Sequence, residues 1–246
     1  MNVILPALFM CLLMAGIVRA IYAASIRVQQ RDILEQKALA RGSVVSDKSD
    51  VFKSLGEIAR LFRTLRSGYN TKLEDVKYAL INNRYRIWYS LLVYRTLRKS
   101  VASSDKTHKR HLFLLLDPSS DQFLPYVCVR NYCTLHNHVI DPVSSLEVNT
   151  AQKKVSCWPK ISRLFPITMR FETYPNMVEK VAAMWSDGLV DELLKGSGEN
   201  YCLEILGNVV IIAYDYELDL RFGDRFDARV DYLLGLAAKL RTISSS

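Results

Sequence analysis

Two cysteines and two histidines lie in one short stretch, Cys128-Val-Arg-Asn-Tyr-Cys133-Thr-Leu-His136-Asn-His138. Thiolate sulfur and imidazole nitrogen are donors that Zn²⁺ prefers in proteins. On an extended strand, His136 and His138 would point to the same face. The stretch has no Cys-x-x-Cys pair, however, and Cys128 lies in an apolar segment where a cysteine often serves as a small hydrophobic side chain. A solvated loop beside a buried cysteine is the favoured interpretation, and a metal site of Cys133, His136 and His138 is the alternative.

Carboxylates form a second group, because Asp215, Glu217 and Asp219 alternate along one expected strand. Three carboxylates on one strand face would suit Ca²⁺ or Mg²⁺. Charged residues also discourage edge strands from pairing with other chains. We favour this second interpretation, so the sequence predicts no metal here.

Motifs of known catalytic mechanisms are absent from the sequence. It contains no Gly-x-Ser-x-Gly, no His-Glu-x-x-His, no phosphate-binding loop and no dinucleotide fingerprint. We therefore expect a protein that is not an enzyme, with no catalytic residues and no cofactor.

Basic residues suggest binding of anions instead. A polar segment at 99–110 carries Lys106, Lys109 and Arg110, and we expect it to be a turn between two strands. Such a turn could contact a lipid phosphate or an acidic partner.

The first residues of the chain are strongly apolar. Val3 to Ala24 contain one charge, Arg19, and as a helix they would extend about 33 Å, against a hydrocarbon core of about 30 Å. A cleaved signal normally has a basic start, which is missing here. We favour a retained transmembrane anchor over a cleaved signal or the core helix of a soluble protein.

Charge is distributed unevenly along the chain. Residues 46–110 carry a net charge of +9 and residues 171–246 carry −6. Basic residues follow the apolar run and none precedes it, which by the positive-inside rule predicts a cytoplasmic C-terminal part. A basic stem would then contact the anionic lipids of the inner leaflet. The candidate membrane-interface residues are Arg19, Arg27, Arg31, Arg60, Arg63 and Arg66.

The five cysteines show no disulfide framework, which fits a reducing compartment. No zinc finger, RNP motif or basic-aromatic repeat accompanies the positive charge, so we expect no nucleic-acid partner. These features together predict a single-pass protein of the inner, cytoplasmic membrane.

Hydrophobic periodicity predicts three parts: an anchor at 1–25, a basic helical stem at 26–75 and a cytosolic α+β domain at 76–246. In the stem, an amphipathic helix over 51–67 would either pack on the domain or lie on the inner leaflet. The domain should contain a mainly antiparallel sheet with two C-terminal helices packed on it. Strands are expected at 85–97, 111–117, 124–130 and 167–174, a hairpin at 200–217, and helices at 177–196 and 224–240.

A resemblance supports this arrangement over about residues 80–240. A Leu-Pro strand is followed by a strand ending in Phe171-Glu-Thr-Tyr174, a helix ending Gly-Leu-Val-Asp-Glu-Leu-Leu, and a hairpin beginning Leu203-Glu-Ile-Leu-Gly-Asn208. This order resembles uncharacterised bacterial single-pass membrane proteins with a cytosolic domain of unknown function. The resemblance implies an α+β fold and no catalytic residues.

The sequence thus predicts a membrane-tethered, non-enzymatic protein-interaction or scaffold domain. Its partners would be the bilayer, anionic inner-leaflet lipids and a protein. The alternative is a membrane-anchored metal-binding or metal-dependent hydrolytic module that uses the cysteine–histidine stretch at 128–138.

Overall fold

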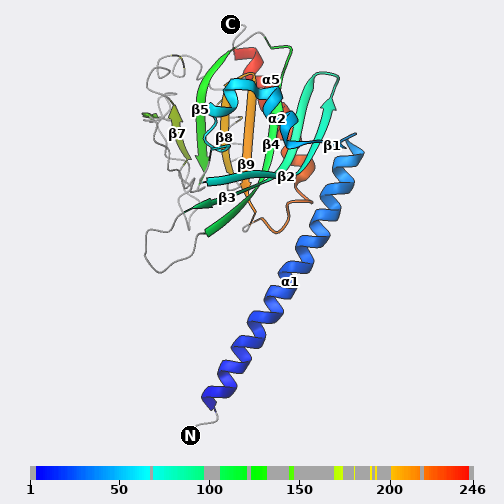
Figure 1. The fold of residues 1–246 in the computed structure, drawn as a ribbon, viewed down its shortest axis with the longest axis vertical. Coiled ribbons are helices and arrows are strands. Elements are labelled where there is room, and N and C mark those ends of the chain that lie inside the picture. The colour runs from blue at the N-terminus through cyan, green and yellow to red at the C-terminus, as the bar shows by residue number, and fades with distance from the viewer. Residues whose placement is uncertain are drawn as a thin grey trace.

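The chain begins with one long helix, α1 (Ile4–Ala40), which projects from the rest of the molecule in the computed structural model (Figure 1). The structure describes residues 4–66, 69–96, 106–120, 123–131, 144–146, 169–173, 201–216 and 219–243, with single positions 180, 189 and 192. Apolar side chains in the first part of α1 are uncovered, since Phe9 is 65% and Leu12 66% exposed. This helix is long and apolar enough to cross a membrane.

The remainder is an α+β fold built on one sheet. Its nine described strands follow the order β1-β2-β3-β4-β9-β8-β5-β7-β6, and every pair is antiparallel. The strands are β1 (Val44–Val45), β2 (Tyr69–Ile81), β3 (Tyr85–Thr96), β4 (Lys106–Leu116), β5 (Leu124–Asn131), β6 (Ser144–Leu146), β7 (Met169–Thr173), β8 (Tyr201–Gly207) and β9 (Val209–Asp215).

Two predicted hairpins are confirmed. β3 pairs with β4 along its full length, and β8 pairs with β9 through a tight turn at Gly207 and Asn208. Gly207 adopts φ +60°, a left-handed conformation that hairpin turns require and that glycine adopts readily. The strands predicted at 124–130 and 167–174 correspond to β5 and β7.

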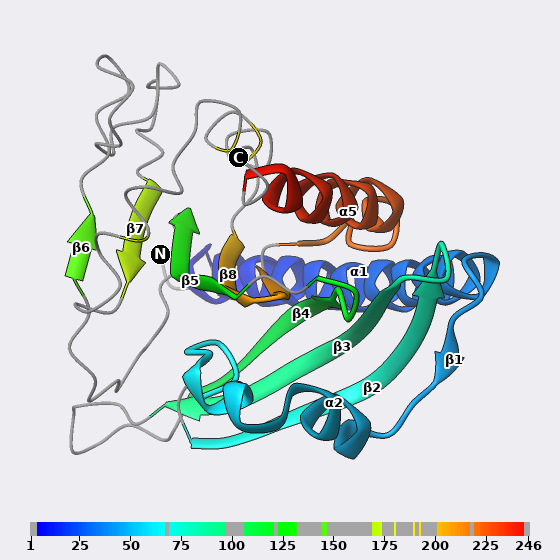
Figure 2. The same cartoon turned by 90° about the horizontal axis from the view of Figure 1, so that it is seen from above.

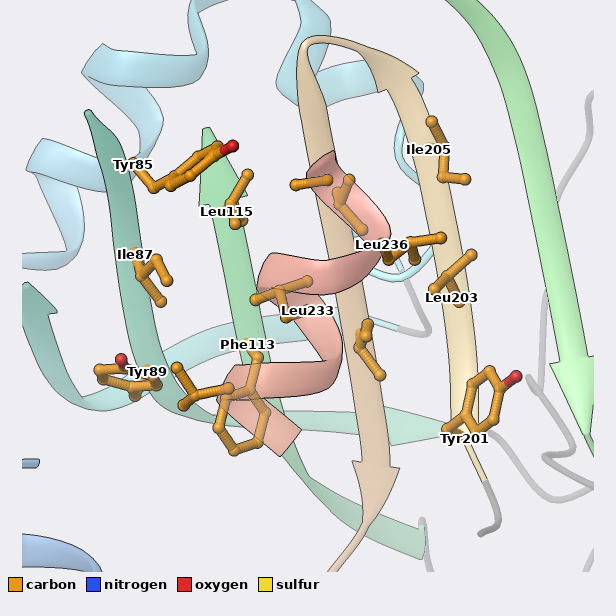
Figure 3. Packing of buried hydrophobic residues seen from close by; sticks show 14 of the residues in the cluster. Tyr85, Ile87, Tyr89, Phe113, Leu115, Tyr201, Leu203, Ile205, Leu233 and Leu236 are labelled. Carbon is orange, nitrogen blue, oxygen red and sulfur yellow. The ribbon is translucent and has the colours of Figure 1, made fainter. Parts of the chain in front are cut away.

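One face of the sheet is covered by α5 (Phe226–Ile243), which confirms the last predicted helix. Figure 3 shows Leu233 and Leu236 of this helix over the sheet, on the side where Phe113, Leu203 and Ile205 point. The end of α1 lies on this face too, and Ala38 belongs to the same buried cluster. Figure 2 shows α1 and α5 on the same side of the sheet.

The opposite face is covered by α2 (Lys48–Leu55) and a short 3₁₀ helix, η1 (Gly56–Leu61). Val51, Leu55 and Phe62 are buried there against sheet residues. The prediction of one continuous helix over 51–67 is therefore wrong. Gly56 ends α2 with φ +56°, and the segment packs on the sheet, which was one of the two alternatives.

Strand β2 was not predicted, and it begins inside the expected helical stem. Its pairing with β3 shifts register at two places, between Tyr69 and Lys72 and between Glu74 and Lys77. Asn70 and Asp75 adopt positive φ at these irregularities. Such bulges interrupt the alternation of polar and apolar residues by which a strand is recognised in sequence. The second predicted C-terminal helix, at 177–196, lies almost wholly outside the described residues.

Candidate functional site

A cavity of about 650 Å³ lies between the C-terminal half of α1 and strands β2, β3 and β4. The loop after β9 completes its wall through Tyr216 and Phe222. A volume of this size is typical of sites for small molecules.

Ion pairs hold α1 against the sheet beside this cavity. Arg31 lies 2.9 Å from Asp75, and Lys77 lies 2.8 Å from Glu35. The hydrogen bond from Lys77 and its positive charge lower the pKa of Glu35. These pairs neutralise two of the carboxylates that line the cavity.

The aromatic ring of Tyr216 has two cations beside it. The guanidinium of Arg27 lies 5.2 Å from the ring centroid and the ammonium of Lys109 lies 5.9 Å from it. Within the described residues neither cation forms an ion pair, and Arg27 Nε has no hydrogen-bond partner. This end of the cavity therefore carries uncompensated positive charge, which favours an anionic group.

His111 lies in the wall close to these cations. Its ring stacks on Phe222 with centroids 4.1 Å apart and contacts Tyr216 at 5.0 Å. Burial, together with the charge of Arg229, lowers the pKa of His111 to about 3, so the ring is neutral at physiological pH. Its Nε2 is buried and has no hydrogen-bond partner among the described residues.

Apolar side chains form much of the remaining wall. Tyr89 and Phe113 contribute from the floor of the sheet, and Val28 and Leu34 from α1. Charged residues of both signs, among them Lys48, Glu74 and Lys77, also line the cavity, so its wall is mixed. A wall that combines apolar and charged side chains suits an amphipathic ligand. The cavity can thus hold a molecule that has an anionic group at one end and a hydrocarbon part at the other.

The predicted membrane-interface residues lie in three different environments. Arg19, Arg27 and Arg31 lie along α1, where Arg27 and Arg31 also line the cavity. Arg60 and Arg66 are exposed on the α2 side of the sheet. Arg63 is only 7% exposed, so its predicted place on the surface is wrong. The chain turns after η1 and directs it inward, where its charge acts on Glu204.

The anion contact predicted for Lys106, Lys109 and Arg110 stays a prediction, but the turn expected to carry these residues is corrected. These residues belong to strand β4 and not to a turn, so successive side chains point to opposite faces. Lys109 lines the cavity, whereas Arg110 is buried on the α2 side with its guanidinium 5.5 Å from the Tyr94 ring centroid. Lys109 is thus the one member of the trio that lines the cavity.

The predicted metal residues Cys133, His136 and His138 lie outside the described residues. Cys128 is described, and it lies fully buried in β5 beside Cys202 and Glu204 of β8. Among the three predicted carboxylates, Asp219 is buried and pairs with Arg229, and Glu217 lies outside the described residues. A paired, buried Asp219 is a structural residue and not a cation ligand.

Comparison with protein-family models, with curated proteins and with solved structures gives no match.

Proposed function

We propose that this protein is a membrane-tethered, non-enzymatic domain that binds an anionic phospholipid in the cavity under α1. The observation that carries the proposal is the position of Arg27 and Lys109. Both cations lie beside the Tyr216 ring at one end of a cavity whose wall also includes apolar side chains.

The distance along α1 supports this assignment. Arg27 follows the apolar run by three residues, which corresponds to about 4.5 Å of helix. If the run crosses the bilayer, Arg27 stands at the level of the lipid headgroups. The phosphate of a neighbouring lipid would then lie between the two cations, and the first carbons of its chains would contact the apolar wall.

The direction of insertion follows from the flanking charges. Arg27, Arg31, Lys37 and Arg41 all follow the apolar run, which favours the cytoplasmic side for the folded domain. The inner leaflet there is rich in anionic lipids and attracts each basic residue by about 1 kcal/mol. The inner membrane location, the protein partner and the scaffold role all remain predictions.

Native mass spectrometry of the full chain in mild detergent tests the lipid preference. The purified protein is mixed with phosphatidylglycerol or with phosphatidylcholine of the same acyl chains. We expect a phosphatidylglycerol adduct that is at least about tenfold preferred, because two cations each contribute about 1 kcal/mol.

Paired variants assign the preference to the cavity. The double variant Arg27→Ala/Lys109→Ala should lose it. The matched variant Lys53→Ala/Arg60→Ala removes the same charge from exposed positions, 76% and 79% exposed, and should keep it. Equal lipid preference in both double variants would contradict the proposal.

Alkaline washing and protease digestion of membranes test the proposed anchor and its orientation. Membranes that carry the C-terminally tagged protein are washed at alkaline pH and then treated with protease from either side. We expect the protein to stay in the membrane and the tag to be digested only from the cytoplasmic side. Release by the wash would rule out the anchor, and digestion from outside would reverse the orientation.

A further inference from the structure

Three potential metal ligands converge on the α2 side of the sheet, and none of them lines the cavity. Cys128 of β5 lies in register with Glu204 of β8, and Cys202 is two residues before Glu204 on the same face. All three side chains are fully buried. Their donor atoms lie within 4.8 Å of one another.

Glu204 provides an independent sign that something is bound here. Its Oε1 accepts hydrogen bonds from Thr64 N at 2.9 Å and from Thr64 Oγ1 at 3.1 Å. Its Oε2 has no hydrogen-bond partner within the described residues, although the side chain is fully buried. A buried carboxylate oxygen without a partner is costly, so a cation at this atom would remove a real penalty.

We propose that Cys128 Sγ, Cys202 Sγ and Glu204 Oε2 form a structural Zn²⁺ site. Two thiolates and one carboxylate are a donor set that zinc accepts and that Mg²⁺ and Ca²⁺ do not favour. Two Zn–S bonds of about 2.3 Å at a tetrahedral angle place the sulfurs about 3.8 Å apart. The Sγ atoms of Cys128 and Cys202 already lie 3.7 Å apart.

The surroundings supply the rest of a zinc site. Two thiolates, one carboxylate and Zn²⁺ sum to one negative charge, and the nearby Arg63 is positively charged and buried. Thr64 Oγ1 lies 3.7 Å from Cys202 Sγ, so its hydroxyl or a water can occupy the fourth tetrahedral position. The ion would thereby join β5 and β8 to the segment that follows η1.

A disulfide between Cys128 and Cys202 is the competing chemistry. It would require the sulfurs to approach to about 2.05 Å. It would use only the two sulfurs and leave Glu204 Oε2 without a partner. The unpartnered carboxylate is therefore the feature that favours a metal over a disulfide.

The test uses the full chain in detergent under reducing conditions. The protein is dialysed against excess ZnCl₂ and then against metal-free buffer, and zinc is measured by inductively coupled plasma mass spectrometry. We expect one zinc per chain in the wild type and at least about a tenfold lower affinity in Cys202→Ser and Glu204→Gln. Cys11→Ser, whose thiol lies exposed on α1, is the control and should keep full zinc.

A second variant separates this site from the cysteine–histidine stretch. His136→Ala/His138→Ala should keep one zinc per chain, and its loss of zinc would overturn the proposal. Absence of zinc from the wild type, or a mass lower by two hydrogens that shows a disulfide in reducing buffer, would also overturn it.

A cobalt-binding experiment tests the site in the wild-type protein, without any substitution that could prevent folding. Wild-type protein loaded with Co²⁺ should show thiolate-to-cobalt charge-transfer absorption, and excess Zn²⁺ should abolish it. Cobalt binding without that absorption would exclude ligation by the cysteines.

Discussion

Gly223 lies so close to α1 that a Cβ atom there would stand 2.3 Å from the carbonyl oxygen of Gln30. The side chain of Gln30 also accepts a hydrogen bond from Asp224 N at 3.0 Å. The loop between β9 and α5 is thus held against the helix that continues from the apolar run. Phe222, in the same loop, is part of the cavity wall. A change that moves this loop away from α1 would therefore also change the wall of the cavity.

Gly223→Ala tests this close approach. The added methyl group cannot be accommodated without moving the loop from α1, because it would meet backbone and not a flexible side-chain end. We expect a loss of about 1–3 kcal/mol in the free energy of unfolding. Denaturant unfolding of the full chain in detergent, followed by the fluorescence of the buried Trp88, measures it. Gly16→Ala, with nothing within 4 Å of the new atom, is the control and should lose no stability, because alanine favours a helix more than glycine does.

Arg41→Ala tests the ion pairs between α1 and α5. Arg41 lies 2.8 Å from Asp227 and 2.9 Å from Asp231, and its side chain is 23% exposed. We expect a loss of about 1 kcal/mol in the same unfolding experiment. Arg60→Ala breaks a far more exposed pair with Glu57 and should cost less than about 0.5 kcal/mol. Equal losses in the two variants would show that the pairs of Arg41 do not hold the helix.

The buried His111 predicts a loss of stability in acid. Its pKa is about 3 in the folded chain and 6.5 in the reference state, so only the unfolded chain binds the proton between these values. Its contribution is present above pH 6.5 and declines as the pH falls towards 3. His111→Phe keeps an aromatic ring beside Tyr216 and Phe222 and should flatten the stability profile in this range. Parallel profiles for variant and wild type would contradict the prediction.

The buried Glu204 predicts that metal-free protein loses stability as the pH rises, the opposite of the effect of His111. Burial, with a further contribution from Cys202, raises its pKa to about 8 from 4.5, against the lowering effects of Thr64 and Arg63. The folded chain therefore keeps a proton that the unfolded chain releases, and stability declines as the pH rises from 4.5 to 8. Glu204→Gln should remove this decline, measured by thermal unfolding with a chelator present. A decline of equal size in the variant would show that another group is responsible.

The sequence predicts those elements whose local patterns are regular. Alternating apolar residues reveal β3, and Gly207 with Asn208 marks the β8–β9 turn. Strand β2 is missed because its bulges at Asn70 and Asp75 interrupt the alternation. The helix expected over 51–67 ends early because Gly56 adopts a conformation that the apolar spacing around it does not reveal.

The sites are harder to predict because they join distant segments. Arg27 and Lys109 are recognisable as basic, but only the docking of α1 on β4 places them beside one tyrosine. Glu204 gave one signal in the sequence, a single carboxylate within an apolar strand. Its pairing with Cys128 depends on the register between β5 and β8, which spacing along the chain does not define.

The most direct test of lipid binding is photo-crosslinking at Tyr216 in bilayers that contain phosphatidylglycerol. A photoreactive phenylalanine analogue replaces Tyr216 in the full chain, and the same analogue at Tyr78, which is partly buried on the other face of the sheet, is the control. We predict that the mass of one phosphatidylglycerol is added at position 216 and not at 78. Absence of lipid from position 216, or equal labelling at both positions, would contradict a phospholipid in the cavity.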